Sequence, residues 1–207
     1  MRFTICLAAL ATLPLVAIPA APGKYNKVLG IGDKAPEWKD LEGTDGKKHA
    51  LADFKDKDFV VVVFTCNSCV VAEAYEDRII AFAEKYAQPE SKLGFVAINV
   101  NTAKEDALPA MKERAAKKKF NFPYLYDPSQ EIARKYGALF TPEFFVLNKE
   151  RKVIYMGAMD DKGPPGEATK HYLDTAAYSL LIGKAFPTTE TSAAAGCRIK
   201  FNPKKDD

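Results

Sequence analysis

The feature that most constrains the fold is one apolar run that ends directly in a pair of cysteines. Residues 59–65 read Phe-Val-Val-Val-Val-Phe-Thr, and Cys66-Asn67-Ser68-Cys69 follows without a break. A continuous run of β-branched and aromatic residues predicts a strand that is buried on both faces, as in the middle of a sheet. The two cysteines are therefore expected at the turn that leaves a central strand.

Strand and helix patterns alternate after this run. Such alternation implies a parallel sheet with covered faces, and a late hairpin adds an antiparallel part. We therefore expect an α/β fold with one mixed central sheet, no internal repeat and no second domain. The expected strands are 59–65, 93–100, 123–126, 143–147 and 152–156, the expected helices run through 72–86, 105–119, 129–136 and 167–182, and 38–41 and 48–51 flank a hairpin turn.

The first 20 residues have the pattern of a signal peptide. Arg2 precedes an apolar stretch over residues 5–18, and small residues follow at Ala20 and Ala21. These are the charged start, apolar core and cleavage site of a secretory signal. The stretch is short for a membrane span, and an uncleaved anchor is the alternative. The sequence thus predicts a signal peptide over 1–20, a domain over 21–183 and a tail over 184–207, in an exported protein, periplasmic or extracellular, without a stable membrane span after cleavage.

Charge and cysteine content narrow the function classes. The formal net charge is only +3, and no basic face with interleaved aromatic residues is visible, so nucleic acid is not expected as a partner. Removal of the leader, which contains Cys6, would leave Cys66, Cys69 and Cys197. An odd number of cysteines leaves at least one thiol unpaired or exchanging partners, which argues against a purely structural disulfide framework.

The spacing of Cys66 and Cys69 allows a small disulfide ring at a helix N-terminus. Free backbone N–H groups and the helix dipole stabilise a thiolate there, and the thiolate is the nucleophile in disulfide exchange. We expect Cys66 to be the more exposed, attacking thiol and Cys69 to resolve the mixed disulfide. A static disulfide, two inert thiols or a zinc site are the alternatives, but His49, His171 and Cys197 show no local ligand spacing. No metal and no other cofactor is expected.

Several motifs resemble the redoxin or alkyl-hydroperoxide-reductase branch of the thioredoxin superfamily. The resemblance covers about residues 30–183 and is strongest to peroxiredoxin-like proteins with a Cys-Asn-x-Cys site. It implies a thioredoxin-like three-layer sandwich with helices on both faces of the sheet. It also implies a cis bond between Thr141 and Pro142 that faces the cysteines and binds an extended peptide. The motifs are Gly32-Asp33-Lys34-Ala35-Pro36, residues 61–69, Tyr75-Glu76-Asp77-Arg78, residues 140–147 and Gly196-Cys197-Arg198-Ile199-Lys200.

The chain also departs from the family pattern near the cysteines. Family members commonly carry His and Pro where this chain has Ser68 and Val70, so we expect the pKa of Cys66 to be less depressed than is usual. Val63 stands where the pocket of a peroxiredoxin has Thr, which argues against hydroperoxide reduction as the main activity. Cys197 is either a third redox thiol that reaches the pair or a free surface thiol.

The first hypothesis for function is therefore an exported thiol–disulfide oxidoreductase that uses Cys66 and Cys69. Its partners would be protein disulfides or dithiols, or a thiol reductant. One alternative is a peroxiredoxin-like thiol peroxidase, a thiol-dependent antioxidant enzyme that uses Cys66. Another is a copper-binding thioredoxin-like chaperone, for which His171 is the available histidine, although His171 and His49 are expected to be surface residues. The redox direction and the oligomeric state do not follow from the sequence.

Overall fold

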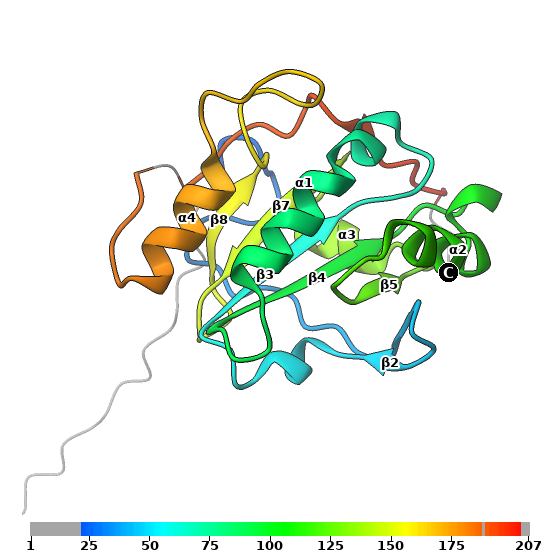
Figure 1. The fold of residues 1–207 in the computed structure, drawn as a ribbon, viewed down its shortest axis with the longest axis horizontal. Coiled ribbons are helices and arrows are strands. Elements are labelled where there is room, and N and C mark those ends of the chain that lie inside the picture. Colours follow the sequence, from blue (N-terminus) through cyan, green and yellow to red (C-terminus); the bar gives the residue numbers. More distant parts are fainter. Residues whose placement is uncertain (1–21, 188, 204–207) are drawn as a thin grey trace, which may run out of the picture.

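The computed structural model describes residues 22–187 and 189–203 (Figure 1). The expected signal peptide lies outside these residues. The strands are β1 (Leu41–Gly43), β2 (Lys48–His49), β3 (Phe59–Phe64), β4 (Leu93–Asn99), β5 (Tyr124–Tyr126), β6 (Phe140–Thr141), β7 (Glu143–Leu147), β8 (Val153–Gly157) and β9 (Cys197–Arg198). The helices are α1 (Val70–Tyr86), α2 (Leu108–Lys118), α3 (Glu131–Tyr136) and α4 (Tyr172–Leu181), and two short 3-10 helices are η1 (Leu51–Phe54) and η2 (Lys104–Asp106).

One mixed seven-stranded sheet forms the middle of the molecule, in the order β2-β1-β5-β4-β3-β7-β8. Strand β3 lies parallel to β4 and antiparallel to β7, and β4 is parallel to β5. Residues Val60 to Phe64 of β3 have no exposed surface. The predictions of a mixed sheet and of a central strand buried on both faces are confirmed.

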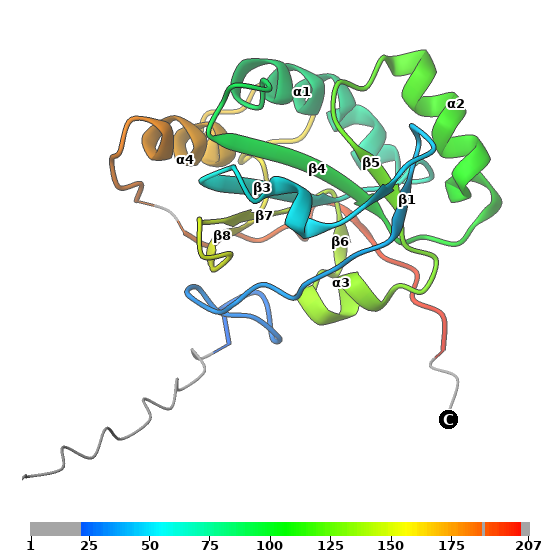
Figure 2. The ribbon, with the colours of Figure 1, turned by 90° about the horizontal axis from the view of Figure 1, so that it is seen from below.

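Helices cover the sheet on both sides (Figure 2). On one face, α1, α2 and α4 pack against the side chains of Val61, Val63 and their neighbours. On the other face, α3 and the segment before β1 pack against Val60, Val62 and Phe64. Alternate residues of β3 thus serve two separate cores, because successive side chains of a strand point to opposite faces. The result is the three-layer α/β sandwich that the sequence predicts.

Three helices begin later than the sequence pattern indicates, α3 by two residues and α2 and α4 by more. The helix expected from residue 167 begins at Tyr172, because Asp161 accepts hydrogen bonds from the backbone N–H groups of Thr169 and Lys170 at 2.8 and 2.9 Å and holds them in a loop. The helix expected from residue 105 is divided into η2 and α2, and Pro109 stands in the first turn of α2, where its missing N–H costs least.

The tail after residue 183 packs back onto the domain. Strand β9 pairs antiparallel with β6 as a separate two-stranded sheet, and Ala193 and Ile199 are buried. Nothing in the local pattern of this Thr- and Ala-rich segment indicates such a strand, and the boundary at 183 stays a prediction. Within the described part of the chain, no helix is long and apolar enough to cross a membrane.

Candidate redox site

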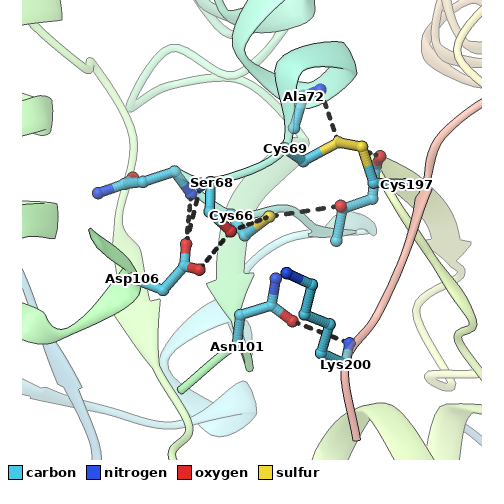
Figure 3. The surroundings of a disulfide bond; sticks show 10 residues. Cys66, Ser68, Cys69, Ala72, Asn101, Asp106, Cys197 and Lys200 are labelled. Atoms are coloured by element: carbon cyan, nitrogen blue, oxygen red, sulfur yellow. Dashed lines mark hydrogen bonds between the residues drawn. A yellow bond between two sulfur atoms is a disulfide. The ribbon is translucent and has the colours of Figure 1, made fainter. Parts of the chain in front are cut away.

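The two cysteines lie where β3 leaves the sheet and α1 begins. Strand β3 ends at Phe64, and Cys69 is the residue that caps α1. The sulfur of Cys69 accepts a hydrogen bond from the N–H group of Ala72 at 3.2 Å (Figure 3). This N–H is one of the donors that a helix N-terminus leaves without an intrahelical partner. The helix therefore contacts the sulfur of Cys69 directly, while the backbone N–H of Cys69 itself acts to lower the pKa of Cys66.

The disulfide of the structure joins Cys69 to Cys197, and Cys66 is a free thiol. The Cα atoms of the bonded pair are 5.8 Å apart, across a sequence separation of 128 residues. The sequence predicts a disulfide between Cys66 and Cys69, so this pairing differs from the expected one. Cys197 therefore reaches the pair and is not a free surface thiol in this structure, while its role as a third redox thiol stays a prediction.

Strand β9 places Cys197 beside the helix cap. In the β6–β9 ladder, Cys197 pairs with Thr141 and Arg198 pairs with Phe140. The preceding Gly196 passes so close to β6 that a Cβ atom there would lie 2.5 Å from the carbonyl oxygen of Thr141. A side chain at position 196 would therefore push the tail away from β6, and glycine lets Cys197 reach Cys69.

Both cysteines of the Cys-x-x-Cys motif are buried. The exposed fraction of Cys66 is 3% and that of Cys69 is 2%, so the two differ little, and the expectation that Cys66 is the attacking thiol stays a prediction. Cys197 packs against the cluster that Cys66 and Cys69 form with Ala72. Cys197 itself is intermediate in exposure, so it is the member of the trio closest to solvent.

Burial also determines the acidity of Cys66. Desolvation raises the pKa of the Cys66 thiol above its ordinary value, and the carboxylate of Asp106 raises it further. The hydroxyl groups of Thr141 and Ser68, 3.4 and 4.0 Å from the sulfur, and the backbone N–H of Cys69 act to lower this pKa without cancelling the rise. The sequence predicted a thiolate stabilised by the helix dipole, and this prediction is wrong for Cys66, since an apolar environment disfavours the charged form.

Asp106 is the site residue that sequence reasoning missed. It is fully buried, and its carboxylate accepts hydrogen bonds from the backbone N–H groups of Asn67 and Ser68 at 2.7 and 3.1 Å and from the Ser68 hydroxyl at 2.5 Å. The carboxylate thus fixes the turn between the cysteines (Figure 3). In the sequence it is only one of two acidic residues before a helix, and nothing there marks it as facing the turn.

Thr141 and Pro142 lie against the cysteines, as the resemblance implies. The bond between them is cis, which confirms that expectation. The Thr141 hydroxyl is 3.4 Å from the sulfur of Cys66, and its carbonyl oxygen is 3.2 Å from the sulfur of Cys69. The next residue, Glu143, accepts hydrogen bonds from the N–H groups of Leu139 and Phe140 at 2.8 and 3.0 Å. One side chain therefore holds the backbone of β6 on which the tail rests.

The Tyr-Glu-Asp-Arg motif anchors α1 to two other segments. Tyr75 and Arg78 both bind the buried carboxylate of Asp160, at 2.6 and 2.7 Å. Glu76 receives a two-point contact from Arg114 of α2, at 2.7 and 3.0 Å. These contacts fix the orientation of the helix that carries Cys69, so the motif positions the site without contacting its sulfur atoms.

Neither histidine lies in a metal-binding arrangement. His49 is paired with Asp45 at 3.0 Å in the β1–β2 hairpin, and His171 is exposed at the start of α4. Among residues 22–187 and 189–203, no group of three or more His, Cys, Asp or Glu residues is placed to hold a metal ion.

Comparison with known proteins assigns the family. The Redoxin family model matches residues 31–174. The chain belongs to the Redoxin family. Family membership together with the disulfide supports a redox function, and the fold of this redoxin is thioredoxin-like.

Solved structures agree with this assignment. A hypothetical protein from Sinorhizobium meliloti is 31% identical, with a TM-score of 0.75, over 86% of this chain and 98% of the other. An uncharacterized conserved protein from Geobacillus kaustophilus is also 31% identical, with a TM-score of 0.77, over 92% of this chain and 100% of the other. A thiol-disulfide oxidoreductase from Bacteroides fragilis, 17% identical with a TM-score of 0.51 over 60% and 89% of the two chains, shares the fold. Among the curated proteins, none matches this redoxin.

Proposed function

We propose that this redoxin is an exported thiol–disulfide oxidoreductase that acts on protein disulfides or dithiols. The observation that carries the proposal is that the end of β3, the start of α1 and strand β6 meet at the sulfur atoms of Cys66 and Cys69. Cys66 and Cys69 share one apolar cluster, and both lie within 3.4 Å of atoms of Thr141, the residue before cis-Pro142. A thiol that lies beside a disulfide, next to the strand that carries a cis-proline, is placed for disulfide exchange.

In the proposed reaction, the Cys66 thiolate attacks one sulfur of a substrate disulfide. The other substrate sulfur leaves as a thiolate and takes up a proton. The Cys69 thiolate then attacks the sulfur of Cys66, which releases the second substrate thiol and leaves a Cys66–Cys69 disulfide. The substrate disulfide is reduced while the enzyme is oxidised, and the reverse sequence oxidises a substrate dithiol.

A cavity beside Pro142 offers room for a substrate peptide. Its volume is about 330 Å³. Its lining includes Val71 and Tyr75 of α1, Pro142 itself and Gly196 of the tail. A side chain that flanks the substrate cysteine would occupy this cavity. By contrast, the cavity that Cys66 lines has a volume of only about 10 Å³, so the Pro142 cavity, and not this one, has room for a substrate side chain.

The test measures reduction of insulin disulfides and oxidation of reduced RNase. Cys66→Ser and Cys69→Ser are each expected to abolish turnover, because each removes one sulfur of the exchange. Cys6→Ser is the matched control, since it makes the same chemical change in the expected leader and should leave turnover unchanged. Full turnover in Cys66→Ser would refute the proposal.

The residues before Cys66 argue against the peroxidase alternative. Val63 stands where the pocket of a peroxiredoxin has Thr, and Val63 is fully buried and carries no hydroxyl that could bind a peroxide. We therefore expect hydrogen peroxide consumption with a thiol donor to be slow compared with disulfide exchange by the same preparation. A rate of peroxide consumption that exceeds the rate of insulin reduction would favour the peroxidase.

Export is the second part of the proposal. The signal-like pattern over residues 1–20 supports it, and so does the disulfide, because disulfides persist in oxidising compartments. We expect the protein in the periplasmic or extracellular fraction, with a mature N-terminus at Ala21. Cell fractionation with N-terminal sequencing tests this, and a cytosolic protein that still begins at Met1 would refute it.

A further inference from the structure

We propose that Cys197 is a third redox residue and that Cys69 is a sulfur shared by two alternating disulfides, Cys66–Cys69 and Cys69–Cys197. The inference rests on the proposed function, because it adds the step that follows formation of the Cys66–Cys69 bond. In this scheme the structure represents the end of the oxidative half-reaction, in which the disulfide has moved from the attacking cysteine to the tail.

The three cysteines are close enough for this transfer. Cys66, Cys69 and Ala72 form one buried cluster, and Cys197 packs against it. Thr141 contacts both sulfur atoms of the motif, through its hydroxyl to Cys66 and its carbonyl to Cys69. Cys69 carries the bond to Cys197, and the free thiol of Cys66 belongs to the same cluster as Cys69. Cys69 is therefore the sulfur to which either Cys66 or Cys197 can bond.

The tail is anchored on both sides of Cys197 without the disulfide. Before it, the N–H of Thr191 donates a hydrogen bond to the carbonyl of Met156 in β8 at 3.0 Å. After it, the buried Ile199 donates a hydrogen bond to the carbonyl of Leu139 at 2.9 Å. Gln130 adds two contacts further on, to the carbonyl of Lys200 at 2.9 Å and to the N–H of Asn202 at 2.7 Å.

These anchors keep the Cys197 thiol beside Cys69 after the bond between them opens. A held thiol reacts with a high effective concentration, because its translational freedom is already lost. Cys197 therefore stays in position to exchange its disulfide with Cys69, because the tail that carries it is held by hydrogen bonds.

The transfer is a disulfide isomerisation that balances without another reactant. The Cys197 thiolate attacks the sulfur of Cys69, the Cys66–Cys69 bond breaks, and Cys66 leaves as a thiolate that takes up the proton lost by Cys197. One disulfide replaces another, so the oxidation state of the protein does not change.

The transfer has two consequences for the enzyme. Cys66 becomes a free thiol again, as it is in the structure. The disulfide moves to Cys197, which is less buried than Cys66 and Cys69, where a thiol reductant can attack it more easily than the original ring.

Disulfide mapping over time tests the relay in the full chain, with Cys6→Ser in every sample so that three cysteines remain. The reduced protein is freed of reductant, mixed with one equivalent of oxidised glutathione as the probe, and quenched with acid at increasing times. Alkylation and mass spectrometry then identify each disulfide. We expect Cys66–Cys69 to appear first and to convert into Cys69–Cys197, and in Cys197→Ser we expect Cys66–Cys69 to persist.

Gly196→Ala tests the placement of Cys197 without removing a sulfur. Its Cβ would meet the carbonyl oxygen of Thr141 at 2.5 Å, so conversion to Cys69–Cys197 should slow. The neighbouring Ala195 is exposed, and Ala195→Ser should convert at the wild-type rate.

Two results would overturn the relay. One is a wild-type protein that stops at Cys66–Cys69. The other is formation of Cys69–Cys197 at the wild-type rate in Cys66→Ser, which would make that bond a structural disulfide. The insulin assay separates the two proposals, because an inactive Cys66→Ser combined with either result refutes the relay alone, whereas an active Cys66→Ser refutes the oxidoreductase itself.

Discussion

At the scale of single residues, the pKa of Cys66 depends on the charge of Asp106, which also holds the turn between Cys66 and Cys69. Asp106 fixes the turn through Asn67 and Ser68, yet its charge opposes ionisation of Cys66. Asp106→Asn removes that charge and retains an acceptor oxygen for the turn. We expect the pKa of Cys66 to fall and the reduced protein to react faster with iodoacetamide near neutral pH, by about fivefold for an interaction of about 1 kcal/mol. The pH profile of alkylation at Cys66 measures the change.

Ser68→Ala is the comparison for this prediction. The Ser68 hydroxyl lowers the pKa of Cys66 by hydrogen bonding, so its removal should move the alkylation profile to higher pH. The two variants alter the same turn but should shift the profile in opposite directions. A shift to higher pH in Asp106→Asn would show that the turn, and not the charge, governs the reactivity of Cys66.

The individual residues also show which parts of the site a sequence can reveal. Cys66 and Cys69 follow from a local motif, because the strand and the turn involve neighbouring positions, and the cis bond before Pro142 follows from the resemblance to the family. The bond between Cys69 and Cys197 does not, since it depends on the register of residues that are 128 positions apart. The burial that raises the pKa of Cys66 likewise depends on residues far along the chain, such as Phe120, Phe122 and Tyr124, which line the same small cavity as Cys66.

At the scale of elements, β6 depends on the carboxyl group of Glu143. Its exposed fraction is 8%, and burial raises its pKa to about 7, although hydrogen bonds from Leu139 and Phe140 act in the opposite direction. The folded protein thus holds this proton in a pH range in which the unfolded chain, with a glutamate pKa of about 4.5, has released it. The contribution of Glu143 to the free energy of unfolding is therefore highest below pH of about 4.5 and falls as the pH rises to about 7.

Glu143→Gln should remove this pH dependence. The amide stays neutral and its oxygen can still accept from β6, so the variant should gain up to about 3 kcal/mol over wild type across the window. Denaturant titrations below, within and above the window measure the difference. Parallel pH dependences in the two proteins would mean that Glu143 is already ionised in the folded protein at acid pH.

The elements themselves were predictable in proportion to their length and regularity. The run in β3 and the amphipathic pattern of α1 specify their structures locally, and both are present. The sequence places the start of α4 too early, because the side chain of Asp161 accepts hydrogen bonds from the backbone of the two residues before His171 and keeps them in a loop. Strands β6 and β9 have two residues each, which is too short for a periodic pattern, so only their mutual pairing defines them.

At the scale of the whole molecule, α1 connects the site to three other parts of the chain. The disulfide links this helix to the tail, Glu76 links it to α2, and Arg78 links it to Asp160 after β8. Only the first of these links is covalent. Its reduction therefore changes the stability of the domain as well as the chemistry of the site.

The loss of stability on reduction distinguishes the two possible disulfides. A cross-link stabilises a protein by restricting its unfolded chain, and the effect grows with the length of the closed loop. The Cys69–Cys197 bond spans 128 residues, and we expect its reduction to lower the free energy of unfolding by about 3–5 kcal/mol, whereas a ring from Cys66 to Cys69 would contribute about 2 kcal/mol. Guanidinium titrations with and without dithiothreitol measure this loss. In Cys197→Ser, where only the small ring can form within the motif, the loss should shrink to that lower value, and an equal loss in both proteins would place the stabilising disulfide between Cys66 and Cys69.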